Sequence, residues 1–231
     1  MKLLAFETAT ESCSVAVWID GDVRERFELA PRRHAELALP WAGQLLAEAG
    51  IARSQLDAIA VGRGPGAFTG VRLAIALAQG IALALDKPVI PVSTLAALAL
   101  QAPAERVLAA IDARMGEVYL GAFARDGDDL VAVSLEAVAK PDAATIPDGD
   151  DWHGVGTGFA AAGGALRAHL QARLASVDAD ALPHAADVAR LAALAFARGE
   201  AIAPDRIEPA YLRNNVALTL EQQQALRDSR R

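Results

Sequence analysis

The chain contains an internal repeat, and this repeat constrains the fold more than any single motif does. Near the N-terminus an apolar strand runs to Glu7, a polar turn follows, and Asp20-Gly21 joins two further strand-like segments. Residues 106–139 follow the same plan, with Asp112 in the place of Glu7 and Asp126-Gly127 in the place of Asp20-Gly21. Asp-Gly between two strand-like segments is a strong hairpin signal. A repeat of this length predicts two related lobes that each begin with three strands.

Helical patterns follow the strands in both halves of the chain. This pattern, in which strands are followed by helices, occurs twice. It predicts an α/β protein with two similar lobes and a cleft between them. We expect the principal helices at residues 35–49, 69–85, 160–174 and 185–198. We divide the chain into an N-terminal lobe, a C-terminal lobe whose last helix can pack back on the first lobe, and a tail, at 1–102, 103–215 and 216–231.

Composition narrows the classes of function. The chain is 53% hydrophobic with a net charge of −7, so it lacks the basic face of a protein that coats nucleic acid by itself. Its single cysteine, Cys13, cannot form an intrachain disulfide, which fits a reducing compartment. We expect no signal peptide and no membrane span, because the apolar stretches are shorter than those segments need. A cytoplasmic protein is the resulting expectation.

The turn after the first strand, Glu-Thr-Ala-Thr-Glu-Ser, is a candidate nucleotide site. In two-lobed ATPases a hydroxyl-rich turn of this kind binds phosphate while the acid holds Mg²⁺ through water. The alternative is a hairpin whose side chains satisfy its own backbone. The second copy, Asp-Ala-Arg-Met-Gly-Glu, has no Ser or Thr and favours that alternative. ATP or ADP with Mg²⁺ is therefore not a required cofactor, and the candidate residues are Glu7, Thr8, Thr10 and Ser12.

A glycine-rich turn, Gly62 to Gly66, precedes the second long helix. It is not a Walker loop, because no Gly-Lys-Ser/Thr follows. Its backbone N–H groups, helped by Arg63 and Arg72, can receive an anion at the start of the helix. Alternatively the glycines only turn the chain sharply. No metal site is expected, since no two of the four histidines are three or four residues apart.

The helix after this turn carries no charge from Leu73 to Leu85. A helix that is apolar on all sides must be buried on all sides, and one small lobe covers only part of it. The remainder would be an exposed apolar patch, which usually marks a protein interface. The alternative is a core helix. Small residues form two ridges, at 70/74/78/82 and at 76/80/84. The predicted interface residues are Leu37, Trp41, Leu45, Gly70, Val71, Ala74, Leu77, Ala78, Ile81 and Ala82.

Three stretches together resemble a known family: Gly-Arg-Gly-Pro-Gly-Ala-Phe-Thr-Gly-Val-Arg, Ile-Asp-Ala-Arg-Met-Gly-Glu-Val-Tyr and Glu-Pro-Ala-Tyr-Leu-Arg-Asn-Asn. The chain is similar, through Asn215, to the bacterial tRNA threonylcarbamoyladenosine biosynthesis proteins called TsaB or YeaZ. The resemblance implies the two-lobed fold of actin, sugar kinases and Hsp70 ATPases. It also implies an inactive relative of TsaD, the subunit that transfers the threonylcarbamoyl group to the adenosine beside the anticodon.

The same resemblance implies partners. TsaB-like proteins bind and activate TsaD through helices of the first lobe, and self-associate through the same surface as a homodimer when alone. The ATPase TsaE joins the pair, and tRNA is reached indirectly through the complex. The expected function is thus that of a non-catalytic subunit.

Two residues depart from the family pattern. Glu7 stands where relatives commonly have Asp, and Ala67 where they commonly have Ser. The longer acid would push Mg²⁺ outward, which weakens the case for nucleotide binding. Two alternatives stay open. One is an ATPase or small-molecule kinase that uses Glu7, Thr8, Thr10 and Asp112, and the other is a peptidase, which the missing metal histidines count against.

Overall fold

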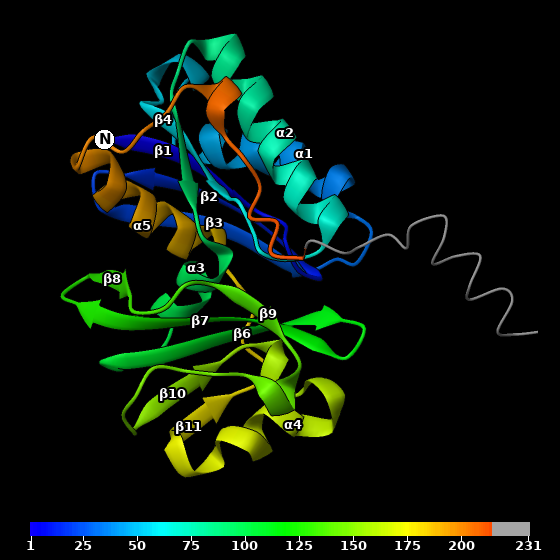
Figure 1. Cartoon of the computed structure of the whole chain (residues 1–231). Coiled ribbons are helices and arrows are strands. Elements are labelled where there is room, and N and C mark those ends of the chain that lie inside the picture. The colour runs from blue at the N-terminus through cyan, green and yellow to red at the C-terminus, as the bar shows by residue number, and fades with distance from the viewer. Residues whose placement is uncertain (214–231) are drawn as a thin grey trace, which may run out of the picture.

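The structure is a computed structural model that describes residues 1–213 as two α/β lobes stacked on one another (Figure 1). Each lobe contains a mixed sheet. In each sheet a central strand has an antiparallel meander on one side and parallel strands on the other. The two central strands belong to the two copies of the repeat, so the predicted duplication is visible as a shared topology.

The sheet of lobe 1 has five strands. Across the sheet they are β3 (Asp22–Leu29), β2 (Ser12–Ile19), β1 (Lys2–Glu7), β4 (Ala58–Gly62) and β5 (Val89–Val92). The first three are antiparallel, and β4 and β5 run parallel to β1. Asp20 and Gly21 form the turn between β2 and β3, and both have positive φ, as a tight hairpin requires.

The sheet of lobe 2 repeats this order. Across the sheet the strands are β8 (Asp129–Ala132), β7 (Glu117–Asp126), β6 (Arg106–Arg114), β10 (Trp152–Val155) and β11 (Leu174–Asp178), and β9 (Ala137–Ala139) also pairs with β7. Here β6, β7 and β8 are antiparallel, whereas β10 and β11 run parallel to β6. The α/β fold class with duplicated, strand-rich lobes is therefore confirmed.

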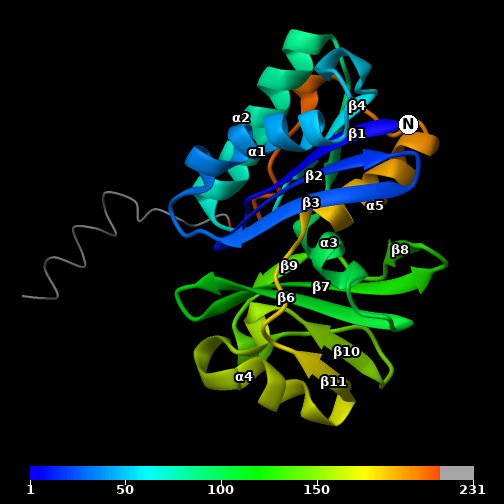
Figure 2. The ribbon, with the colours of Figure 1, turned by 180° about the vertical axis from the view of Figure 1, so that it is seen from behind.

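Long helices pack on both faces of the first sheet, and shorter helices pack on the second. The helices are α1 (His34–Glu48), α2 (Phe68–Leu85), α3 (Thr94–Leu100), α4 (Ala161–Leu170) and α5 (Ala185–Ala197). On lobe 1, α1 and α2 pack on one face and α5 on the other (Figure 2). The short α3 lies between the lobes, because Leu95 and Leu98 pack against the second sheet while Ala97 packs against the first. On lobe 2, α4 covers the outer face.

Five single 3₁₀ turns complete the described structure. They lie at Arg53–Gln55, Pro141–Ala143, Thr157–Phe159, Gln171–Arg173 and Pro204–Arg206.

The chain returns from lobe 2 to lobe 1 after β11. Helix α5 packs against β1, β2, β4 and β5 of the first sheet. Residues 199–213, here called the C-terminal strap, continue over lobe 1 beside α2 (Figure 1). Ile202 pairs with Val89, and the N–H of Ala210 donates to the carbonyl of Arg63. The lobe boundary at residue 102 stays a prediction, and the proposed tail at 216–231 lies outside the described residues.

Candidate partner-binding surface and interlobe turns

One face of α2 is buried in its own lobe. Ala74, Ala78 and Ala82 are completely excluded from solvent, and Val71 is 3% exposed. Gly70 lies on the same face. The prediction that these five residues contact a partner is therefore wrong. Their small side chains let the helix approach the sheet of lobe 1 closely, so the ridge serves the core.

The opposite face of α2 is open and apolar. Ala76, Gly80 and Ala84, the second ridge of small residues, are exposed, and Leu83 is 66% exposed. Leu77 and Ile81, both predicted interface residues, are half-buried and pack against the core at the edge of this face. The apolar patch expected from the sequence exists, but it lies on the other side of the helix.

Helix α1 differs from the prediction in the same way. Leu45 is 2% exposed and belongs to the core, so its assignment to an interface is wrong. Leu37 and Trp41 are half-buried against the same core. The open residues of α1 include Leu39, which is 50% exposed. The apolar i, i+4 stripe of α1 packs against the sheet of its own lobe, because burying it there removes the most apolar surface from water.

A groove of 290 Å³ separates α1 from α2. Among residues 1–213, Arg53 is the only charged residue in its lining. The lining residues are Leu4, Leu39, Ala42, Gly43, Leu46, Arg53, Leu56, Ile81, Ala84 and Leu85. Together with the open face of α2, this groove forms what we call the α1/α2 outer face. Its exposed or half-buried members are Leu39, Gly43, Arg53, Ala76, Leu77, Gly80, Ile81, Leu83, Ala84 and Leu85.

By length and composition, α2 also meets the criterion for a membrane span, and it alone does so among residues 1–213. One third of its 18-residue window is buried in the structure. A core helix with one open face meets the same criterion, and α2 packs on β4 and β1.

Glu7, at the end of β1, is a completely buried carboxyl group. One carboxylate oxygen accepts the N–H of Ala9 at 2.7 Å, and the other accepts the hydroxyl of Thr94 at 2.9 Å. Burial raises the pKa of Glu7 to about 7, and these hydrogen bonds oppose the rise only in part. The carboxyl group is therefore held by protein donors between β1 and α3.

The other three nucleotide candidates are also buried and bonded within the protein. The hydroxyl of Thr8 donates to the carbonyl of Gly70 at 2.7 Å. The hydroxyls of Thr10 and Ser12 lie 3.0 Å apart. This is the arrangement expected of a hairpin that satisfies its own polar groups. Nucleotide binding by these residues stays a prediction.

The glycine-rich turn leaves room for the β1–β2 turn. A Cβ atom at Gly62 would lie 1.9 Å from a carboxylate oxygen of Glu7, and one at Gly66 would lie 2.4 Å from the carbonyl oxygen of Ala9. No real side chain fits at such distances. Glycine is therefore required at both positions because the β1–β2 turn packs against them. This requirement favours the interpretation that the glycines serve the packing of the chain rather than anion binding.

The corresponding turn in lobe 2 is more open. Asp112 accepts the N–H of Arg114 at 2.8 Å and forms an ion pair with its exposed guanidinium. A hollow of 220 Å³ lies between the two turns and is lined by Asp112 but not by Glu7. The two acids that a kinase would use are thus not presented to one cavity. Within residues 1–213, no three His, Cys, Asp or Glu side chains form a cluster suited to a metal ion.

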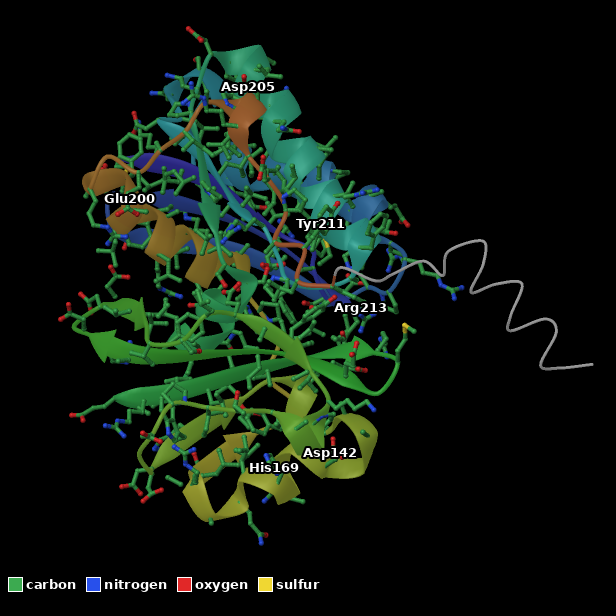
Figure 3. The ribbon with its side chains drawn as sticks, viewed as in Figure 1. Asp142, His169, Glu200, Asp205, Tyr211 and Arg213 are labelled. Carbon is green, nitrogen blue, oxygen red and sulfur yellow. The ribbon has the colours of Figure 1, made fainter. Side chains whose placement is uncertain are left out.

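An aromatic cluster joins the C-terminal strap to α2. The guanidinium of Arg72 lies 3.6 Å from the ring centre of Phe68, and its Nε donates to the hydroxyl of Tyr211 at 2.5 Å. The rings of Phe68 and Tyr211 are 6.0 Å apart. Figure 3 shows Tyr211 beside α2 and Arg213 near the second lobe. Sequence reasoning missed Phe68, although an exposed aromatic residue in the first turn of an apolar helix is a usable signal.

The fold and this surface define the class: a two-lobed α/β protein of the actin-like type with an open apolar helical face. Residues 28–220 match the family described as TsaD, tRNA N6-adenosine threonylcarbamoyltransferase. The chain is 44% identical to a tRNA threonylcarbamoyladenosine biosynthesis protein TsaB of Escherichia coli, over 94% of this chain and 96% of the relative. It is 40% identical to the TsaB protein of Haemophilus influenzae, over 94% and 95% of the two chains.

A solved structure agrees with these relatives. YeaZ from Pseudomonas aeruginosa superposes with a TM-score of 0.83 at 46% identity, covering 91% of this chain and 99% of that one. The chain belongs to the TsaB, or YeaZ, family of tRNA threonylcarbamoyladenosine biosynthesis proteins.

Proposed function

We propose that this chain is a non-catalytic cytoplasmic subunit that binds and activates a TsaD-type transferase through the α1/α2 outer face. The exposed apolar ridge of α2 carries the proposal. Ala76, Gly80 and Ala84 present almost no side-chain relief, so the backbone of a partner helix can approach closely. Exposed apolar surface of this kind usually marks a protein interface.

The buried turns support a non-catalytic role. The carboxyl group of Glu7 and the hydroxyl of Thr8 are engaged by protein groups rather than open to a substrate. Chemistry then belongs to the transferase, and this chain requires no cofactor. In the same proposal a TsaE-type ATPase docks on the pair, and two copies of this chain associate through the same face when the transferase is absent.

Gly80→Arg tests the proposal. A Cβ atom at Gly80 meets nothing within 4 Å, so the lobe accepts the side chain while the partner helix does not. Titration calorimetry with the TsaD-type subunit of the same organism should show affinity reduced by about 100-fold or more, as for loss of an interface hot spot.

The matched control is Ala168→Arg on the exposed surface of α4, which should leave partner affinity unchanged. Unchanged binding of the Gly80→Arg variant would refute the docking face. Turnover of ATP by the isolated chain would refute the non-catalytic assignment.

A further inference from the structure

A second exposed surface lies at the interlobe end of α2, on the side of the C-terminal strap. Phe68 is 55% exposed and Tyr211 is 49% exposed. The guanidinium of Arg72 covers part of both, 3.6 Å from the first ring centre and 5.5 Å from the second. We call these three residues the stacking platform. They place two aromatic rings and one guanidinium plane together at the surface.

The platform borders a hollow of 210 Å³ between the lobes. Arg114 and Arg213 line this hollow, and among residues 1–213 no Asp or Glu does. Their acidic partners, Asp112 and Glu117, belong to the β6–β7 hairpin itself. The side chain of Arg114 is 78% exposed. With Arg72, three guanidinium groups gather beside the aromatic rings, against the two carboxylates that pair with Arg114 and Arg213.

Aromatic rings and guanidinium planes are the groups on which proteins stack unpaired nucleobases, and nearby arginines bind the phosphates. We propose that the platform and its hollow bind an unpaired nucleotide of a tRNA loop. The base stacks on Phe68 and Arg72, and Arg114 contacts the phosphate. The choice of tRNA rests on the proposed function. This direct contact departs from the expectation that tRNA is reached only through the complex.

Charge and shape favour RNA over the transferase as occupant. Apart from Arg53, the α1/α2 outer face is apolar, and its groove lies on the α1 side of α2, where Ile81, Ala84 and Leu85 line it. The platform is cationic and aromatic and lies on the strap side, with Tyr211. A polyanion is attracted to this surface, and the attraction depends on salt.

Two substitutions at one position separate stacking from simple apolar contact. Phe68→Leu keeps an apolar side chain but removes the π face, whereas Phe68→Trp keeps a ring. The probe is a tRNA anticodon-arm hairpin, and the control is a blunt duplex of the same stem without the loop. Binding is measured by fluorescence anisotropy, once with the isolated chain and once with its complex with the transferase subunit.

Phe68→Leu should weaken hairpin binding by ~5- to 150-fold, the loss expected for one stacked base, while Phe68→Trp should stay within about twofold of the wild type. Arg114→Gln should lower the salt dependence by about one phosphate contact. Circular dichroism checks that the variants fold.

Equal affinity for hairpin and duplex, or equal hairpin binding by both Phe68 variants and the wild type, would overturn the proposal. So would loss of transferase binding by Phe68→Leu with RNA binding unchanged, because the platform would then be a protein contact. Gly80→Arg keeps the two proposals separate, because it should weaken transferase binding by about 100-fold or more but leave hairpin binding by the isolated chain intact.

Discussion

The two lobes share a sheet but not a helical layer. In lobe 1 the connection from β3 to β4 contains the 15-residue α1, whereas in lobe 2 the connection from β9 to β10 contains only a three-residue 3₁₀ turn. Between the parallel strands, lobe 1 has the 18-residue α2 and lobe 2 has the 10-residue α4. Helix α4 is interrupted by left-handed conformations at Ala162, Gly163 and Gly164.

The outward surfaces of these layers also differ. The exposed face of α4 carries Arg167 and His169, whereas that of α2 carries Ala76, Gly80 and Leu83. Both copies retain the same strand order, because the order of the strands determines on which face of the sheet each connecting helix packs. The outer layer is free to diverge. Among the described helices α2 and α4, which occupy equivalent places in the two lobes, α2 thus has the more apolar open face, and the proposed docking face lies there.

The largest expected effect distinguishes the two faces of α2. Ala78→Arg places an unpaired charge in the core, which should cost about 4 kcal/mol or more and lower Tm by about 10 °C or prevent folding. Gly80→Arg on the open face should change the free energy of unfolding by no more than about 1 kcal/mol. Thermal and urea denaturation measure both. Similar losses for the two variants would contradict the assignment of faces.

The next effect contrasts the matching acids of the two lobes. The pKa of Glu7 is raised from 4.5 to about 7, so the folded state holds a proton between these pH values that the unfolded state releases. The resulting stabilisation, about 3 kcal/mol, is fully present below pH 4.5 and is lost as the pH rises to 7. Glu7→Gln should remove this slope from urea unfolding curves.

At the matching place in lobe 2, Asp112→Asn removes only an ion pair with the exposed Arg114, so we expect a change below about 1 kcal/mol. Parallel stability–pH curves for wild type and Glu7→Gln would show that the buried carboxyl group is not protonated as described.

The smallest effect compares glycines in the equivalent helices α2 and α4. Gly80→Ala should stabilise the chain by about 0.5–1 kcal/mol, because Ala favours a helix interior. Gly163→Ala should destabilise it by about 1 kcal/mol, because Gly163 has φ of +69° although the space around it is open. Differential scanning calorimetry resolves changes of this size, and equal signs would contradict the comparison.

Much of the fold could be predicted because its signals are local. The Asp20-Gly21 turn, the second copy at residues 106–139 and the strand–helix alternation each depend on residues close in sequence. Helix α5 was predicted at residues 185–198 and is observed at Ala185–Ala197. These features were sufficient for the α/β class and the duplicated lobes, whereas the strand order of each sheet comes from the structure.

The candidate site could be predicted only in part, because contacts distant in sequence decide it. Two ridges of small residues on α2 look alike in the sequence, and the contact of Gly70 with Thr8 shows which one faces the core. Thr94 donates to Glu7 from 87 positions away, and Tyr211 reaches Arg72 from 139 positions away. Periodicity identifies an apolar helix, but it does not give the rotation of that helix against its sheet.

The return of α5 to lobe 1 has a consequence for synthesis of the chain. Leu3, Ala5 and Ala16 lie on the sheet face that α5 covers. While the ribosome is still making lobe 2, that face has only the short α3 beside it, although every strand of the first sheet has already been synthesised. The first lobe therefore completes its core only after α5 has been synthesised, near the end of translation. A prematurely terminated chain that lacks residues 185–197 would expose the apolar face of the first sheet to chaperones and proteases.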